Sequence, residues 1–250
     1  MALLAGLATG LGGLAVFFDK SGSKIFLAAA LGFSAGVMIY VSMVEILAVA
    51  QEKTVAAIGE CGGGWAAVGA FFFGMLVIAL LEKLLPTPEQ KCGAMPANVE
   101  RAGLMRTGVF TALAIAVHNF PEGLATFVSA LDAPSVALPV VVAVAIHNIP
   151  EGIAVAIPLY RATGSKGKAF VFSLLSGLAE PVGALLGMLV LMPVMNDLVF
   201  GVVFAAVAGI MMYIAIDELL PSSREGSPVA SVVGAIAGMA VMAVSLLLFK

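Results

Sequence analysis

The chain has 250 residues, of which 62% are hydrophobic and 11% are charged, and its mean hydropathy is +1.13. Soluble proteins carry about 25% charged residues, so this composition excludes a soluble globular domain and indicates a protein of the lipid bilayer. The net charge of −3 excludes little, because the positions of the charges matter more than their sum in a membrane protein.

Runs of about 20 apolar residues are long enough to cross the hydrocarbon core of a bilayer. In chain order they predict eight transmembrane helices, at residues 1–18, 25–50, 62–84, 105–130, 135–160, 168–193, 198–220 and 228–249. No basic residue precedes the first run, which favours a retained span over a cleaved signal peptide. The longest break, about 85–104, is predicted to be a flexible cytoplasmic loop. We therefore expect an all-α membrane protein whose residues 1–250 form a single polytopic domain.

The basic residues predict the orientation. Ten of the 12 Lys and Arg residues lie in or beside the first, third, fifth and seventh loops. The positive-inside rule makes these loops cytoplasmic, so both termini are expected outside. Cys61 and Cys92 would then lie on opposite sides of the membrane, and an internal disulfide is not expected.

Three pairs of segments in different spans resemble each other. The pairs are 35–47 with 208–220, 6–12 with 177–183, and 118–123 with 147–152. The second pair aligns Thr9 with Glu180, although chance could explain that match because Gly, Leu and Ala are common here. Each pair joins an even span to an odd one, so its members cross the membrane in opposite directions. Such inverted repeats are typical of secondary transporters, whose substrate site lies at the repeat interface.

Several ionisable residues fall within predicted spans, where a charge costs about 2.5–3.5 kcal/mol on insertion scales. They are Glu45, His118, Glu122, His147, Glu151 and Glu180. No Lys or Arg occurs at the same depth in the predicted spans. Protons or metal cations are therefore expected to neutralise the carboxylates.

The repeated His-Asn-x-Pro-Glu-Gly motif points to metal. Its His and Glu are four residues apart and share a helix face, and its Asn adds an amide oxygen at the edge of that face. The proline removes a helical hydrogen bond, and irregular backbone in a membrane is tolerated where it lines a cavity or water path. Two such helices offer two imidazoles, two carboxylates and two amides, enough for one or two ions. Nitrogen and oxygen ligands without thiolate suit Zn²⁺, Fe²⁺, Mn²⁺, Co²⁺ and Cd²⁺.

For several polar residues the sequence leaves more than one role open. Asn119 and Asn148 are either metal ligands or interhelical hydrogen-bond partners. Glu45 is a candidate gate or relay. Asp217 and Glu218 lie near the cytoplasmic end of their span, so a solvated helix end and a metal exit site are both open.

The paired motifs, with Ser42-Met43-Val44-Glu45 and the segment 176–181, resemble the ZIP family (Zrt-, Irt-like proteins), in particular its bacterial ZupT-like branch. The resemblance runs over nearly the whole chain. It implies a bacterial inner-membrane protein that takes divalent metal into the cytoplasm through a binuclear centre. The implied ligands are His118, Asn119, Glu122, His147, Asn148, Glu151 and Glu180. It also implies that spans 1–3 and 6–8 form an inverted repeat. Many members carry a His-rich loop after the third span, but 85–104 contains no His.

Two rival functions use the same residues. A proton-conducting or metal-regulated channel would need the acids without carrying metal, and metal stoichiometry would separate it from a carrier. An intramembrane metalloprotease would need a HExxH-like helix, which the sequence lacks, so we expect neither an enzyme nor a catalytic cofactor. The expected partners are divalent metal ions and the lipid bilayer, with a homodimer allowed and no nucleic acid. The physiological metal, the coupling ion and the direction of flux are not determined by the sequence.

Overall fold

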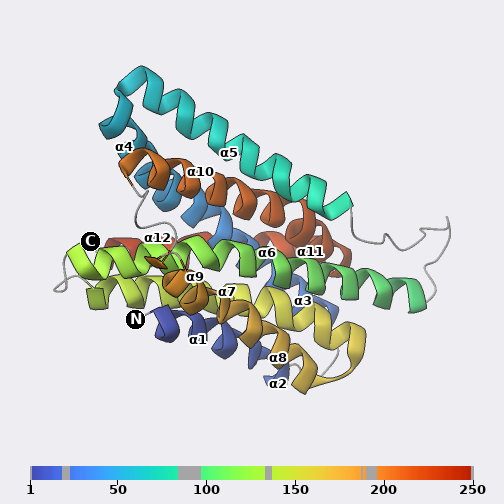
Figure 1. The fold of residues 1–250 in the computed structure, drawn as a ribbon. Helices are drawn as coiled ribbons and strands as arrows, with labels where there is room; N and C mark the ends of the chain where they lie inside the picture. Colours follow the sequence, from blue (N-terminus) through green and yellow to red (C-terminus); the bar gives the residue numbers. More distant parts are fainter. Residues whose placement is uncertain are drawn as a thin grey trace.

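The computed structural model describes residues 2–18, 23–83, 97–132, 137–186, 188–189 and 196–248, and these residues form helices and no β-strand. The helices are α1 (Ala2–Gly13), α2 (Ala15–Phe18), α3 (Lys24–Val41), α4 (Leu47–Ile58), α5 (Glu60–Lys83), α6 (Ala97–Asp132), α7 (Ala137–Thr163), α8 (Lys166–Gly177), α9 (Ala179–Leu186), α10 (Asp197–Tyr213), α11 (Leu220–Gly226) and α12 (Pro228–Leu248). Two π-helical turns, Ser42–Ile46 and Ile214–Leu219, connect α3 to α4 and α10 to α11 without a break. Figure 1 shows α5 lying beside α10 and α6 lying beside α7.

In the described residues the eight predicted spans appear in the predicted order. Five helical stretches are long and apolar enough to cross a membrane by length and composition. They are Lys24–Ile58, Glu60–Leu80, Lys166–Leu186, Asp197–Gly226 and Pro228–Leu248. The apolar stretch Ala2–Phe18 is shorter, whereas α6 and α7, with 36 and 27 residues, exceed the roughly 20 residues that a crossing needs. The prediction of an all-α membrane protein is confirmed.

Several predicted boundaries are wrong. The second span continues to Ile58 rather than residue 50, and α6 begins at Ala97, inside the predicted loop 85–104. The apolar run ends earlier than the helix because polar residues such as Gln51 and Glu52 are good helix formers and continue it past the apolar stretch. Residues 84–96, which include Cys92 and most of the predicted loop, lie outside the described residues.

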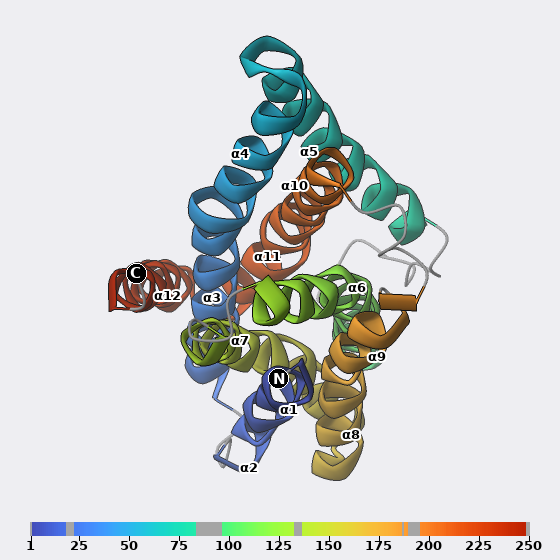
Figure 2. The ribbon, with the colours of Figure 1, turned by 60° about the vertical axis from the view of Figure 1, so that its left-hand side comes forward.

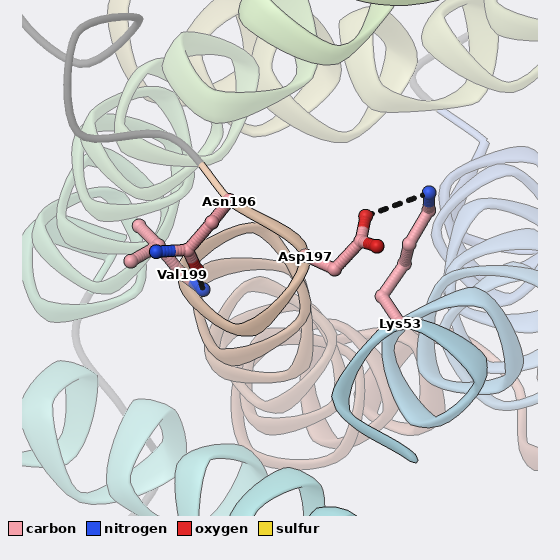
Figure 3. A network of polar contacts seen from close by, with 4 residues as sticks. All are labelled: Lys53, Asn196, Asp197 and Val199. Atoms are coloured by element: carbon pink, nitrogen blue, oxygen red, sulfur yellow. Dashed lines mark hydrogen bonds and ion pairs between the residues drawn. The ribbon is translucent and has the colours of Figure 1, made fainter. Parts of the chain in front are cut away.

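Side chains of polar residues cap three helix starts, at α3, α8 and α10. The oxygens of Ser23, Ser165 and Asn196 accept a hydrogen bond from the backbone N–H three residues later. Figure 3 shows the last of these at Val199, 2.9 Å from the Asn196 oxygen, beside the ion pair of Lys53 with Asp197. That ion pair, at 2.9 Å, joins α4 to the first turn of α10 on an exposed surface.

The helices pack in two groups, which Figure 2 shows from the side. One group contains α3, α4, α5, α10, α11 and α12. The other contains α1, α2, α6, α7, α8 and α9. The groups meet where α3 contacts α7 and where α6 contacts α10 and the turn Ile214–Leu219. The two groups therefore share an interface that runs along α6 and α7, the helices that carry the repeated motif.

Close glycine contacts in the first group repeat across the two halves of the chain. A Cβ on Gly36 would collide with the backbone oxygen of Ala235, and one on Gly209 would collide with that of Phe71. Gly36 in the second span aligns with Gly209 in the seventh. Gly36 contacts the eighth span and Gly209 contacts the third span, and these two spans are themselves counterparts in the repeat. Small residues allow such close approach of membrane helices. The equivalent contacts support the inverted repeat of spans 1–3 and 6–8.

The π-helical turns also occur at equivalent places. Ser42–Ile46 aligns with the last five residues of Ile214–Leu219, and each turn contains a glutamate, Glu45 or Glu218. A π-helical turn is a single wider turn, with hydrogen bonds between residues five apart, inside an α-helix, and such turns are frequent at functional sites. Sequence analysis did not predict them, because no Pro or Gly marks either turn.

Candidate metal centre

The repeated motif lies on α6 and α7, which pack against each other along their length. Both helices continue through the proline of the motif, Pro121 in α6 and Pro150 in α7. The motif glycines set the neighbours: a Cβ on Gly123 would collide with the backbone oxygen of Glu180, and one on Gly152 with that of Thr9. Glycine thus brings α9 against α6 and α1 against α7 at the motif.

The two motif asparagines are fully buried and bond to neighbouring helices. Nδ2 of Asn119 donates to the backbone oxygen of Ser176 over 3.3 Å. Nδ2 of Asn148 donates to the backbone oxygen of Ala5 over 3.1 Å and to Oε2 of Glu180 over 2.9 Å. A carbonyl or carboxylate oxygen needs a donor, so the amide nitrogen must face these acceptors. The amide nitrogens of both asparagines therefore make interhelical hydrogen bonds, which is one of the two roles that the sequence left open.

The amide oxygens are the other half of the same side chains. Oδ1 of Asn119 and Oδ1 of Asn148 are buried and have no hydrogen-bond partner among the described residues. A buried acceptor without a partner costs about 1–3 kcal/mol. A cation that accepts these oxygens as ligands would offset that cost. The two predicted roles of the asparagines, metal ligand and interhelical hydrogen-bond partner, are thus compatible, because the amide oxygen would serve the first and the amide nitrogen serves the second.

Two of the predicted carboxylate ligands have described side chains. Glu151 on α7 and Glu180 in the first turn of α9 are fully buried. The sixth span breaks at Leu178, between α8 and α9, two residues before Glu180. Carboxylates are rarely buried unless they are paired or bind a metal. Among the described residues, Asn148 joins α1, α7 and α9 at this place, because its amide nitrogen binds both the backbone oxygen of Ala5 and the carboxylate of Glu180.

Three of the seven predicted ligands cannot be placed. His118, Glu122 and His147 lie on the helical backbones of α6 and α7, but their side chains are outside the described part of the structure. Among the side chains that are described, no group of three or more His, Cys, Asp or Glu could hold a metal ion. Asn119, Asn148, Glu151 and Glu180 are the members of the set that the structure places.

The three remaining acidic candidates differ in their exposure. Glu45 is half-buried inside the π-helical turn of its span rather than at the span's end, and Asp217 is exposed. Glu218 is buried and pairs with Arg106, whose Nη1 lies 3.3 Å from Oε1. The side chains of Arg106 and Glu218 are 20% and 5% exposed, so the solvated reading of Glu218 is wrong. This ion pair links α6 to the π-helical turn Ile214–Leu219 across the interface of the two helix groups.

Hydroxyl groups around the site were missed by sequence analysis. Oγ of Ser34 on α3 donates to the backbone oxygen of Pro150 over 2.7 Å, across the group interface. Oγ of Ser173 donates to the backbone oxygens of Thr9, over 2.8 Å, and Gly152, over 3.3 Å. The signal available in the sequence was the presence of serines in spans that are otherwise apolar.

A multi-pass membrane protein with buried amide and carboxylate oxygens on a repeated motif is typical of ion transporters. The family model for ZIP Zinc transporter matches residues 86–246. "Zinc transporter ZupT" of Streptococcus mutans is 55% identical over 250 residues, which covers 98% of this chain and 95% of that protein. Proteins with the same description from Clostridium perfringens and Corynebacterium glutamicum are 50% and 54% identical, cover 100% of this chain and are themselves covered to 94% and 97%. The chain belongs to the ZIP zinc transporter family.

Proposed function

We propose that this protein carries divalent transition-metal ions, Zn²⁺ foremost, across the bacterial inner membrane into the cytoplasm. The observation that carries the proposal is the pair of buried asparagines on a repeated motif, whose amide nitrogens hold neighbouring helices while their oxygens have no hydrogen-bond partner among the described residues. The metal is the substrate, and the seven proposed ligands are six residues of the two motifs together with Glu180. Relatives described as zinc transporters support Zn²⁺ as the first metal to test.

The chemistry follows from the donor set. An incoming ion exchanges its water for carboxylate oxygens of Glu151 and Glu180 and the amide oxygens of Asn119 and Asn148, together with the motif histidines and Glu122. Nitrogen and oxygen donors favour Zn²⁺ and its neighbours, because Mg²⁺ and Ca²⁺ gain little from imidazole. Carboxylates that would otherwise carry an expensive charge in the hydrocarbon are neutralised by the ion. Two facing motifs provide enough donors for a binuclear centre.

The proposed orientation has both termini outside and the basic loops in the cytoplasm, as the distribution of Lys and Arg indicates. The eight spans act as one membrane domain. The sequence contains no nucleotide-binding motif, so transport would be secondary, driven by the metal gradient or by a coupled ion.

Uptake of ⁶⁵Zn²⁺ by proteoliposomes tests the proposal. The double variant Glu122→Ala, Glu151→Ala should lose uptake and metal binding. The matched control Glu52→Ala, at an exposed acid on α4, should retain both. Transport by the double variant at the wild-type rate would exclude the proposed site. Proton flux without bound or transported metal would instead favour the channel.

A further inference from the structure

The inverted repeat relates Thr9 on α1 to Glu180 on α9, and the structure places the two residues equivalently. The backbone oxygen of Thr9 packs on the motif glycine of α7, Gly152, and the backbone oxygen of Glu180 packs on the motif glycine of α6, Gly123. One turn further on, Gly12 meets the backbone oxygen of Ile149, and its counterpart Gly183 meets that of Phe120. The weak sequence match between the first and sixth spans is therefore a true structural equivalence.

The hydrogen bonds of the asparagines follow the same symmetry. Asn148 donates to the backbone oxygen of Ala5 on α1, and Asn119 donates to that of Ser176 on α8, which is the residue equivalent to Ala5. The symmetry then fails at one place. Asn148 also donates to the carboxylate of Glu180, whereas the position that would make the equivalent bond to Asn119 is Thr9, a shorter and neutral residue.

The hydroxyl of Thr9 is buried without a hydrogen-bond partner among the described residues. A threonine inside a helix commonly bonds back to the carbonyl one turn earlier, and this one does not. Its Oγ1 lies beside Gly177, 3.0 Å from where a Cβ on that glycine would be, and Gly177 follows the Ser176 whose oxygen binds Asn119. The site has two halves, one around Asn119 and one around Asn148. The Thr9 hydroxyl, which has no partner among the described residues, thus lies next to the Asn119 half.

We infer that Thr9 is a further metal-site residue, the neutral counterpart of Glu180, and that its hydroxyl serves the divalent cation in the Asn119 half, directly or through a water. This inference rests on the proposed function. The Asn148 half contains Glu180, and the Asn119 half contains Thr9 in its place. The two halves of the site therefore differ by one negative charge, and the Asn119 half holds a divalent cation less tightly. This difference in charge gives the ion one position of higher affinity and one of lower affinity. Without it, the repeat would make the two positions equivalent.

Zinc titration of purified protein against a competing chelator, with ⁶⁵Zn²⁺ uptake, tests the inference. Thr9→Val removes the hydroxyl at nearly constant shape and should weaken the looser of two binding events and slow uptake by roughly tenfold, while Thr9→Ser should behave as wild type. The unfolding temperature without metal should be similar for both, which separates a metal role from a structural one. Equal zinc binding and uptake in Thr9→Val and Thr9→Ser would overturn the inference.

An exchange between the repeats gives a second, independent readout. Glu180→Thr alone should lose the tight binding event, and Thr9→Glu added to it should restore at least tenfold of the lost affinity, because the carboxylate returns on the equivalent position. Absence of rescue in a folded double variant would count against the equivalence. If Glu180→Thr itself binds zinc like wild type, the proposed function fails. If Glu180→Thr loses binding and neither Thr9 experiment shows an effect, only the role of Thr9 fails.

Discussion

The amide nitrogen of Asn148 lies 2.9 Å from Oε2 of Glu180, and both side chains are fully buried inside the protein. The bond joins α7, which carries one copy of the repeated motif, to α9, which carries no copy. It fixes the direction of the carboxylate and leaves the amide oxygen of Asn148 for another partner. Glu180 is thereby in contact with the motif, although 32 residues separate it from Asn148 in the sequence.

Replacing Asn148 tests this relationship. Asn148→Ala removes both the amide oxygen and the N–H that orients Glu180, and Zn²⁺ affinity should fall by about 10–100-fold, as is usual when an orienting partner of a metal ligand is lost. Asn148→Asp keeps an oxygen but removes the donor and places a second carboxylate beside Glu180. It should bind Zn²⁺ with an affinity between those of Asn148→Ala and the wild type. Chelator competition measures both, and an unchanged affinity in Asn148→Ala would contradict the site.

The motif glycines should tolerate no side chain. A Cβ on Gly152 collides with the backbone oxygen of Thr9, so Gly152→Ala must push α1 from α7, at a cost of about 1–3 kcal/mol in the free energy of unfolding. The control Gly69→Ala places its methyl group in open space and should leave the unfolding temperature unchanged or slightly raised. Thermal unfolding in detergent compares the two, and equal unfolding temperatures would argue against the close packing of α1 on α7.

The ion pair of Arg106 with Glu218 should stabilise the interface of the two helix groups. Arg106→Ala leaves a buried carboxylate without its guanidinium partner and should lower the free energy of unfolding by about 1–3 kcal/mol. A double-mutant cycle with Glu218→Ala isolates the interaction of the pair. Lys53→Ala, which breaks the exposed pair with Asp197, is the control and should cost less than about 1 kcal/mol. Additive effects of Arg106→Ala and Glu218→Ala would show that the pair contributes nothing.

Zinc should stabilise the folded protein because it binds the native site and not the unfolded chain. At a free Zn²⁺ concentration 100 times the dissociation constant, the gain is about 2.7 kcal/mol. The same concentration of Mg²⁺ should give no increase in the unfolding temperature. A Glu151→Ala, Glu180→Ala variant should lose the response to Zn²⁺, and chelation should abolish it in the wild type. A zinc response that survives in the variant would place the binding elsewhere.

The affinity for Zn²⁺ should fall in acid. Imidazole and carboxylate ligands must be deprotonated to bind metal, and imidazole side chains generally titrate between about pH 5 and 8. Protons therefore compete with Zn²⁺, and affinity should fall as the pH drops through this range and recover on neutralisation. The assay is Zn²⁺ binding by purified protein at constant free metal. Affinity that rises on acidification would argue against histidine ligands.

Much of the fold could be predicted from the sequence. The apolar runs gave the number and order of the spans, because the length of an apolar run is what the bilayer thickness selects. Helix ends were predicted less well. The polar residues 51–54 continue α4 and residues 97–104 begin α6 outside the apolar runs, since helix propensity does not stop where hydrophobicity does.

For the site, the repeated His-Asn-x-Pro-Glu-Gly determined by itself that the His and Glu of each copy share one face of their helix, because residues four apart are neighbours on a helix surface whatever the rest of the chain does. Only the tertiary structure decided that the Asn148 amide binds Glu180, that Arg106 binds Glu218, and that Thr9 stands where symmetry would put a second carboxylate. Local spacing is a property of one helix, but these three relationships depend on how helices far apart in the chain approach one another, and glycine contacts with distant backbone set that approach.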